Sequence, residues 1–309
     1  MDLEIITVGS RGILFHYTDV KMDTLNEPVN IYVINGKNHL FICDTHLGPD
    51  VMKEVVSYLD EQGMTSKPII VFNSHYDPDH VFGNCFFKDE LIISHSKCRR
   101  ILETKGEKLL EQFEQLKKGN VEIVLPNVVF DKRISFEEDE IEFLHTPAHT
   151  EDSSSCIDYP EKILFAGDNI LLEPLPYLDR FDVVEFKETL EFYKSLLLSG
   201  KIKKIVTTHT DIVTDTMQID ELLNYLENYN TFTVDTSNYT LRYKLIHYNN
   251  LSEHAKQFRE KDNVQQAIDF SKAALAMLTE LEPEASEDLL EQIVAEKERI
   301  KTALSELEE

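Results

Sequence analysis

A continuous apolar run at residues 68–72 is followed almost at once by a dense cluster of polar side chains. The run is short, continuous and rich in β-branched residues, which is typical of a buried strand. Residues 74–80 read Ser-His-Tyr-Asp-Pro-Asp-His and carry four side chains that can bind metal: His75, Asp77, Asp79 and His80. Such groups are costly to desolvate at a strand end unless positive charge neutralises them. The pattern therefore predicts that this strand end binds cations, and two cations would suffice.

Four other apolar runs also end in a residue that can bind a metal. These residues are Asp44 after 40–43, His149 after 140–144, Asp168 after 163–166 and His209 after 202–207. A single histidine or aspartate of this kind is usually an ordinary polar residue at a turn. Strand ends at one edge of an α/β sandwich, however, are rigid platforms that can converge on one site. The joint pattern, in this order, indicates a metal centre.

The first two-thirds of the chain alternates apolar strands with amphipathic helices. Helices are expected at 50–62, 96–118 and 183–198. Strands are expected at 3–8, 12–16, 30–35, 39–43, 68–73, 91–94, 121–125, 127–130, 140–144, 154–158, 163–166 and 202–207. Many strands with few helices predict an α/β fold of two sheets with helices outside, a four-layer αββα sandwich.

The pattern becomes helical after residue 216. Helices are expected at 217–229, 249–260, 263–281 and 285–308, with some strand character at 231–248. The second and third helices resemble one tetratricopeptide repeat, but a single repeat cannot bury a solenoid core. The sequence therefore predicts two domains, a catalytic domain at 1–215 and a mostly helical extension at 216–309.

Composition narrows the class of protein. The 309 residues include 42% apolar residues, which allows a sizeable core, and the net charge of −26 disfavours nucleic acid as a partner. The four cysteines form no C-x-x-C pair and no disulfide framework. The first residues show no signal-peptide pattern, and no apolar run is long enough for a membrane span. We expect a cytoplasmic protein that acts on a small-molecule substrate.

Taken together, the motifs H-x-D-x-D-H, T-P-x-H, F-A-G-D and the final His209 resemble the metallo-β-lactamase superfamily over about residues 3–215. The chain also resembles the glyoxalase II-like and flavodiiron-like branches of this superfamily. The resemblance implies the αββα fold with a dinuclear site at its rim. It further implies the roles of the matching residues: His75, Asp77 and His149 on one metal, Asp79, His80 and His209 on the second, Asp168 bridging, Asp44 buried beneath the metals, and Asp79 as the catalytic residue.

Asp77 departs from the commonest form of the family motif, H-x-H-x-D-H, which has a histidine at that position. With Asp79 and Asp168 it gives three carboxylates, which together with one bridging hydroxide balance the charge of two divalent cations. The added oxygen ligand favours iron or manganese over zinc, because harder ligands suit harder metals. The metal identity therefore stays open among iron, manganese and zinc.

Other positions near the motifs are expected around the site. His46 stands where a glycine is common, and we expect it at the surface or behind the metal ligands. Tyr76, Tyr177 and Arg180 are candidates for the substrate pocket, although packing or a surface ion pair would also explain them.

The primary hypothesis is hydrolysis of an ester, thioester or lactone by a hydroxide that bridges two metals about 3.5–4 Å apart. The alternative is a di-iron oxidoreductase of the flavodiiron type that reduces dioxygen or nitric oxide with a separate electron donor. Nuclease chemistry or metal binding without catalysis are further alternatives. An apolar stripe on the last helix, formed by Leu290, Ile293, Ile300, Leu304 and Leu307, fits either burial or a homodimer through the C-terminal helices.

Overall fold

The computed structural model describes residues 2–22, 26–170 and 182–308. The chain divides into two compact units, of which the first comprises residues 1–172 and 184–219 and the second comprises 173–183 and 220–309. The first unit carries all the strands of the described residues, and the second is helical. The assignment of catalysis to 1–215 and of an extension to 216–309 stays a prediction.

The larger sheet of the first unit has seven strands among the described residues, in the order β1-β2-β3-β4-β5-β6-β7. Strands β1 to β4 pair antiparallel, and β4 to β7 pair parallel. The strands are β1 (Leu3–Val8), β2 (Gly12–Lys21), β3 (Asn26–Asn35), β4 (Leu40–Cys43), β5 (Ile69–Phe72), β6 (Leu91–His95) and β7 (Val128–Phe130). The carboxyl ends of β4 and β5 therefore lie side by side at one edge of this sheet.

The smaller sheet has the order β12-β11-β10-β9-β8. Its strands are β8 (Arg133–Phe136), β9 (Ile141–His145), β10 (Ser154–Asp158), β11 (Ile163–Phe165) and β12 (Lys204–Val206). Strand β10 is antiparallel to both β9 and β11, and β12 is parallel to β11. As a result β9, β11 and β12 run in one direction, and the loops that follow them leave from the same edge.

Side chains of the larger sheet alternate between two apolar layers, as the period of a strand requires. Ile13, Phe15 and Val33 face the layer that also holds Val51 and Val55 of α1 (Pro49–Glu61). The intervening residues, among them Leu14, Tyr32, Phe41 and Phe72, face the smaller sheet. They form a second core with residues of that sheet that include Phe143 and Phe165. Two apolar faces on one sheet explain why helices and a second sheet cover it.

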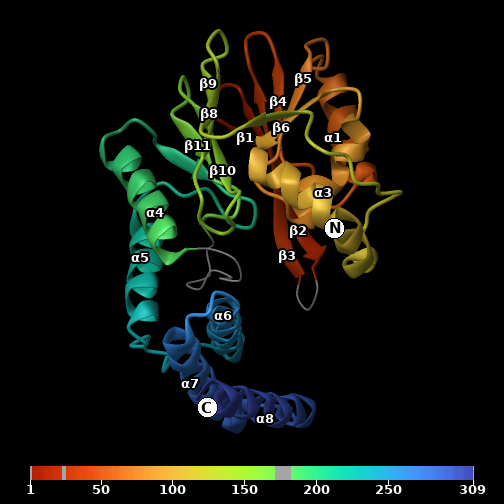
Figure 1. The fold of residues 1–309 in the computed structure, drawn as a ribbon. Coiled ribbons are helices and arrows are strands. Elements are labelled where there is room, and N and C mark those ends of the chain that lie inside the picture. The colour runs from red at the N-terminus through yellow and green to blue at the C-terminus, as the bar shows by residue number, and fades with distance from the viewer. Residues whose placement is uncertain (1, 23–25, 171–181, 309) are drawn as a thin grey trace. The chain divides into compact units, whose positions relative to one another are not determined.

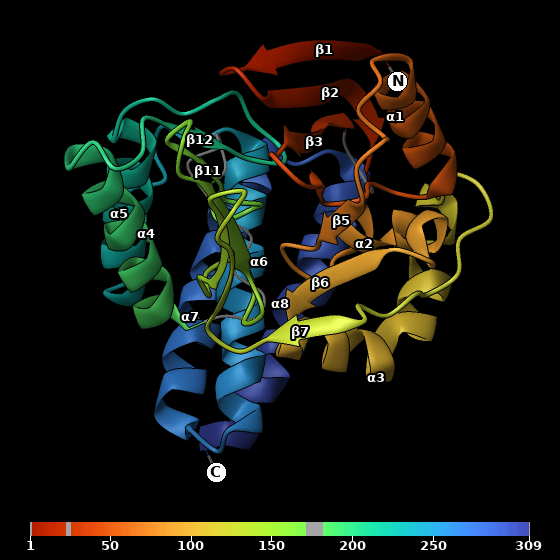
Figure 2. The same cartoon turned by 90° about the horizontal axis from the view of Figure 1, so that it is seen from above.

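Helices complete the layers of the first unit (Figures 1 and 2). The helices α1 and α3 (Ser96–Gln112) cover the larger sheet, and α4 (Val183–Leu198) covers the smaller one. Tyr193 of α4 is fully buried, and its hydroxyl lies 2.5 Å from Ser155 Oγ on β10. The order helix, sheet, sheet, helix confirms the predicted αββα sandwich.

The second unit consists of helices from residue 220 onward. They are the last part of α5 (Met217–Asn230), then α6 (Leu241–Glu260), α7 (Val264–Leu281) and α8 (Glu287–Glu308). Of the apolar stripe on α8, Ile293, Ile300 and Leu304 are buried, whereas Leu290 is 39% exposed. Burial within the chain therefore accounts for most of the stripe, and a homodimer stays a prediction. Among the described residues, none of the helices is both long and apolar enough to cross a membrane.

Two expected strands are wrong, and one strand was missed. Residues 121–125 form no strand; Val121 instead belongs to a buried cluster with Leu102 and Leu109 of α3, so side-chain packing replaces backbone pairing there. The expected strand character at 231–248 gives way to α6, which begins at Leu241 because the Thr240 hydroxyl accepts a hydrogen bond from Tyr243 N. Strand β8, at the edge of the smaller sheet, was not expected.

Candidate metal centre

Both sheets direct polar residues to one rim of the first unit. Asp44 follows β4, and His75 follows β5, at the adjacent carboxyl ends of two parallel strands. His149, Asp168 and His209 follow β9, β11 and β12, which run in one direction. The cluster continues into the short helix α2 (Pro78–Val81), which carries Asp79 and His80. The convergence follows from the topology of the two sheets.

Three of the predicted ligands form a first triad. His75, Asp77 and His149 each offer a ligand atom, and these atoms all lie within 4.8 Å of one another. Asp77 Oδ2 lies 3.3 Å from His75 Nε2 and 3.3 Å from His149 Nε2. His75 and His149 are buried, and Asp77 is partly exposed. Asp77 is thus placed to bind a metal that also contacts both imidazoles.

A second triad consists of Asp79, His80 and His209, with ligand atoms also within 4.8 Å of one another. Asp79 Oδ2 lies 3.2 Å from His209 Nε2 and 3.4 Å from His80 Nε2. Asp79 and His80 are buried, and the His209 side chain is 10% exposed. Each triad therefore combines two imidazoles with one carboxylate.

Asp168 lies between the two triads. Its Oδ2 atom is 3.3 Å from His209 Nε2 and 3.4 Å from His80 Nε2, in the second triad. The same atom is 3.8 Å from His75 Nε2 and 4.0 Å from His149 Nε2, in the first triad. One carboxylate oxygen is therefore close to four imidazoles, which is the position that a bridging ligand requires.

Several of the candidate ligand atoms have no hydrogen-bond partner in the part of the protein that the structure describes and are available to bind metal ions. His75 Nε2, His80 Nε2 and Asp168 Oδ1 are buried without a hydrogen-bond partner among the described residues. Buried polar atoms are normally hydrogen-bonded, and leaving one unpaired costs free energy. Imidazole nitrogens and carboxylate oxygens are ligands of zinc, iron and manganese. The donor set of these residues fits two divalent cations.

The electrostatics of the cluster favour cations. Burial raises the pKa of Asp79 and of Asp168, but the nearby positive charges of His80 and His209 outweigh burial and hold both pKa values well below the ordinary one. Burial lowers the pKa of His80 and of His209, yet the Asp168 charge leads the interactions that raise both well above the ordinary value. The buried carboxylates thus stabilise positive charge on the histidines, and metal cations bound at the site would neutralise the same carboxylates.

Asp44 lies behind the second triad and fixes His80. Its Oδ2 is 2.7 Å from His80 Nδ1 and accepts a hydrogen bond of 2.7 Å from Ser74 Oγ. Its Oδ1 accepts a second bond of 2.7 Å from Ser74 N. An Nδ1–H that donates to Asp44 leaves the lone pair of His80 on Nε2, the atom that faces Asp79 and Asp168. This hydrogen bond therefore holds the His80 ring in place.

Other partners of the ligands were missed from the sequence. His209 Nδ1 lies 2.8 Å from the carbonyl oxygen of Pro28, to which it donates in the tautomer that frees Nε2. Asn169 Oδ1 accepts a hydrogen bond of 3.2 Å from His149 N, and Ser74 bonds Asp44. Asn169 and Ser74 are next to predicted ligands in the sequence, so they could have been predicted as partners. The role of Pro28 could not, because every residue has a backbone carbonyl oxygen.

The remaining predicted residues are not members of either triad, and His46 lies close enough to Asp79, His80 and His209 to feel their charges. His46 is fully buried, so a surface position is wrong; its Nδ1 accepts a hydrogen bond of 2.8 Å from Leu47 N. Burial lowers the pKa of His46 to about 3, so the ring is neutral. Tyr76 is 3% exposed and belongs to an apolar cluster that includes residues of α3, which favours the packing role over the pocket role. Tyr177 and Arg180 lie outside the described residues.

Comparisons with known proteins agree with this architecture. Residues 25–212 match the sequence model of a family described as the metallo-beta-lactamase superfamily. A metallo-beta-lactamase from Pontibacter korlensis is similar in structure, with 16% identity, a TM-score of 0.59, and coverage of 74% of this chain and 100% of that one. The DIM-1 metallo-beta-lactamase is 16% identical, with a TM-score of 0.59 and coverage of 74% of this chain and 98% of that one. A metallo-beta-lactamase from Hirschia baltica is 13% identical, with a TM-score of 0.59 and coverage of 73% of this chain and 98% of that one. At these identities the structural likeness shows the fold.

Proposed function

The chain belongs to the metallo-beta-lactamase superfamily, and on that premise we propose that it is a metal-dependent hydrolase with a dinuclear centre. The superfamily consists mostly of metal-dependent hydrolases. The observation that carries the proposal is the position of Asp168 Oδ2 within 4.0 Å of imidazoles from both ligand triads. A site for a single metal would not need a carboxylate between two separate sets of ligands.

The proposed ligand sets follow the two triads. His75, Asp77 and His149 would hold one metal, and Asp168 would contact both. Asp79, His80 and His209 would hold the second. When bound, the two cations lower the pKa of a water molecule and polarise the carbonyl group under attack.

The protein residues would orient and neutralise this centre. Asp44 holds the His80 ring with Nε2 toward the site, and Pro28 does the same for His209 through its carbonyl oxygen. We keep Asp79 as the proposed catalytic residue: one of its oxygens lies beside the imidazoles of the second triad, and the other would accept the proton of the attacking water.

We propose an ester, thioester or lactone as the substrate. Three of the four thiols support an attacking water over a covalent cysteine mechanism, because burial raises the pKa of Cys43, Cys85 and Cys98 and disfavours the thiolate form. Carbonyl electrophiles of this kind need no nucleophilic side chain when two metals activate water.

Asp77 supports iron or manganese as the proposed metal. It gives the first triad an oxygen ligand in place of a third imidazole, and harder oxygen donors move the preference away from zinc. The same observation favours a second candidate function, a di-iron oxidoreductase that reduces dioxygen or nitric oxide. The second unit is helical over its described residues, so we propose that this chemistry would draw electrons from a separate donor.

Metal analysis and substrate turnover test the two functions. Protein purified without chelator and analysed by inductively coupled plasma mass spectrometry should contain about two metals per chain. Panels of esters, thioesters and lactones should be hydrolysed without any reductant. Absence of metal after reconstitution with iron, manganese and zinc would refute the dinuclear centre. Consumption of dioxygen by the anaerobically reduced protein, with no hydrolysis, would select the oxidoreductase.

The Asp168→Asn variant tests the bridging position. It keeps the shape of the side chain but removes the charge that both triads face, so metal content and hydrolysis should fall together. Asp139→Asn is the matched control, since Asp139 is a buried carboxylate bonded to His39 outside the triads. Full metal content and full activity in Asp168→Asn would remove Asp168 from the centre.

A further inference from the structure

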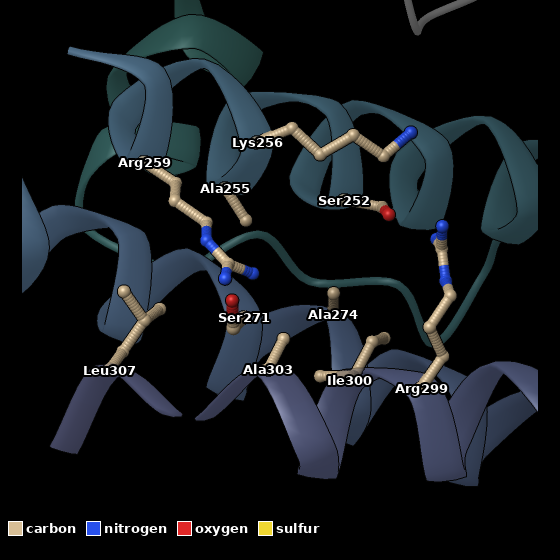
Figure 3. A pocket seen from close by; sticks show the side chains of 10 residues that line it. All are labelled: Ser252, Ala255, Lys256, Arg259, Ser271, Ala274, Arg299, Ile300, Ala303 and Leu307. Atoms are coloured by element: carbon tan, nitrogen blue, oxygen red, sulfur yellow. The ribbon is translucent and has the colours of Figure 1, made fainter. Parts of the chain in front are cut away.

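The helical unit contains a groove between α6 and α8, with α7 at its floor (Figure 3). The cavity has a volume of about 260 Å³. Small side chains from each helix open it, since Ala255, Ala274 and Ala303 leave space that larger residues would fill. Ile300 and Leu307 of α8 add an apolar wall. The groove lies wholly within the second unit.

Three cations line this groove although the chain carries a net charge of −26. Lys256 and Arg299 each pair with a glutamate three residues earlier on their own helix, at 2.6 Å and 2.7 Å. Arg259 of α6 pairs with Glu306 of α8 at 2.7 Å. The cations are 49%, 56% and 49% exposed, and exposed pairs of this kind contribute little free energy. Each of the three cations can therefore release its glutamate and bind another anion with little loss of free energy.

Arg259 has unused hydrogen-bond donors. A guanidinium group has five N–H donors, and Glu306 accepts a bond from Nη2 alone. Its Nε and Nη1 have no partner among the residues that the structure describes. Figure 3 shows the guanidinium group of Arg259 pointing from α6 toward the hydroxyl group of Ser271 on α7. The two side chains thus offer donors to the same end of the groove.

Ser271 provides an independent observation. The residue is 7% exposed, lies on α7 and lines the groove. Its hydroxyl makes no hydrogen bond to any described residue, although helical serines often bond a carbonyl of the preceding turn. Because Ser271 lines the groove, its free hydroxyl can pair with a water molecule or with a ligand there. Beside it, Ala274 and Ala303 offer only apolar surface.

We propose that this groove binds a small organic monocarboxylate with an apolar tail. The carboxylate would accept hydrogen bonds from Arg259 and Ser271, and the tail would lie on Ala274, Ala303 and Ile300. Because a water molecule occupies about 30 Å³ of liquid, the cavity has room for about nine non-hydrogen atoms. Heptanoate has this size. A ligand so small should bind with a dissociation constant on the order of 1 mM.

Isothermal titration calorimetry of the full chain with sodium heptanoate tests the site. Saturable binding is expected, and 1-heptanol, which has the same tail without the charge, should bind at least tenfold more weakly, on the order of one lost charge-assisted bond. Arg259→Gln should weaken binding about tenfold, and Ser271→Ala about threefold. Ala303→Leu should abolish binding, because the added side chain fills the groove without changing any charge.

Lys301→Gln is the matched control for charge, since Lys301 forms an exposed pair with Glu298 on α8 and does not line the groove. Circular dichroism establishes that each variant is folded. Should Ala303→Leu fail to fold, Arg259→Gln decides, because its side chain is half exposed. The absence of saturable binding, equal binding of 1-heptanol, or equal loss in Arg259→Gln and Lys301→Gln would overturn the proposal.

Discussion

Replacing Asp44 with asparagine should release the second metal while leaving the shape of the site intact. The Asp44 carboxylate takes three contacts of 2.7 Å, from Ser74 N, Ser74 Oγ and His80 Nδ1. An asparagine that keeps its oxygen toward Ser74 N turns its NH₂ group toward His80 Nδ1, which must then accept a hydrogen bond instead of donating one. His80 would then favour the tautomer with its proton on Nε2, and a protonated nitrogen cannot bind a metal.

The size of the effect follows from these contacts. Loss of a partner that orients a metal-binding histidine typically lowers metal affinity about 10- to 100-fold, or about 1.4–2.7 kcal/mol. Hydrogen bonds to a charged group contribute about 1.5–3 kcal/mol each, and one of the three is retained. With two bonds lost, we expect the free energy of unfolding of the metal-free protein to fall by about 3–6 kcal/mol.

Asp139→Asn is a closely matched control. Asp139 is 2% exposed and also takes three contacts, from Asn38 N, His39 N and His39 Nδ1. His39 precedes β4, whereas Asp44 follows it, so this pair lies at the opposite end of the strand. Both variants should lose similar stability in urea denaturation. In competition titrations with a chelator, only Asp44→Asn should lose affinity for one of two metals.

Two results would refute this reasoning. Wild-type affinity for both metals in Asp44→Asn would mean that the bond from Asp44 does not set the His80 tautomer. Equal loss of metal affinity in Asp139→Asn would mean that lowered stability, rather than the orientation of a ligand, controls binding.

Three further predictions concern single residues. Asp77→His should shift the metal retained from an equimolar mixture of iron, manganese and zinc toward zinc, measured by mass spectrometry; an unchanged ratio would mean that this ligand does not select the metal. Phe143→Ala should lower the free energy of unfolding, measured by urea denaturation, by about 3–5 kcal/mol, because the Phe143 ring is fully buried and stacks on Phe72 with ring centroids 4.3 Å apart. The control Phe86→Ala, at a residue that is 38% exposed, should lower it by less than half of that amount. Burial raises the pKa of Asp152 to about 6, above its unfolded value of about 3.9, so Asp152 should lower the stability of the metal-free protein by about 2 kcal/mol as pH rises from 4 to 8. In urea titrations the pH profile of Asp152→Asn should differ from that of the wild type by this amount, and an identical profile would contradict the prediction.

Much of the fold was predictable because its apolar patterns are local. The runs at 68–72 and 163–166 are continuous and formed the interior strands β5 and β11. The periodic helices α1, α4 and α7 lie close to their expected bounds. The resemblance to the metallo-β-lactamase superfamily, seen in the motifs, is confirmed. Patterns failed where a tertiary contact overrode them. The apolar residues at 121–125 pack on α3 instead of pairing, and the cap at Thr240 extends α6 into a segment rich in strand-forming residues.

By itself, the sequence determined which side chains can bind metal and that each one follows an apolar strand. These properties depend on residue type and spacing, which are local. Only the tertiary structure decided the distances among ligands, since His75 and Asp168 come from different sheets and meet through the packing of the sandwich. It also decided that the carbonyl oxygen of Pro28 orients His209, and that Arg259 and Ser271 share a groove. Contacts between residues distant in sequence depend on how whole elements pack, and no local pattern specifies that.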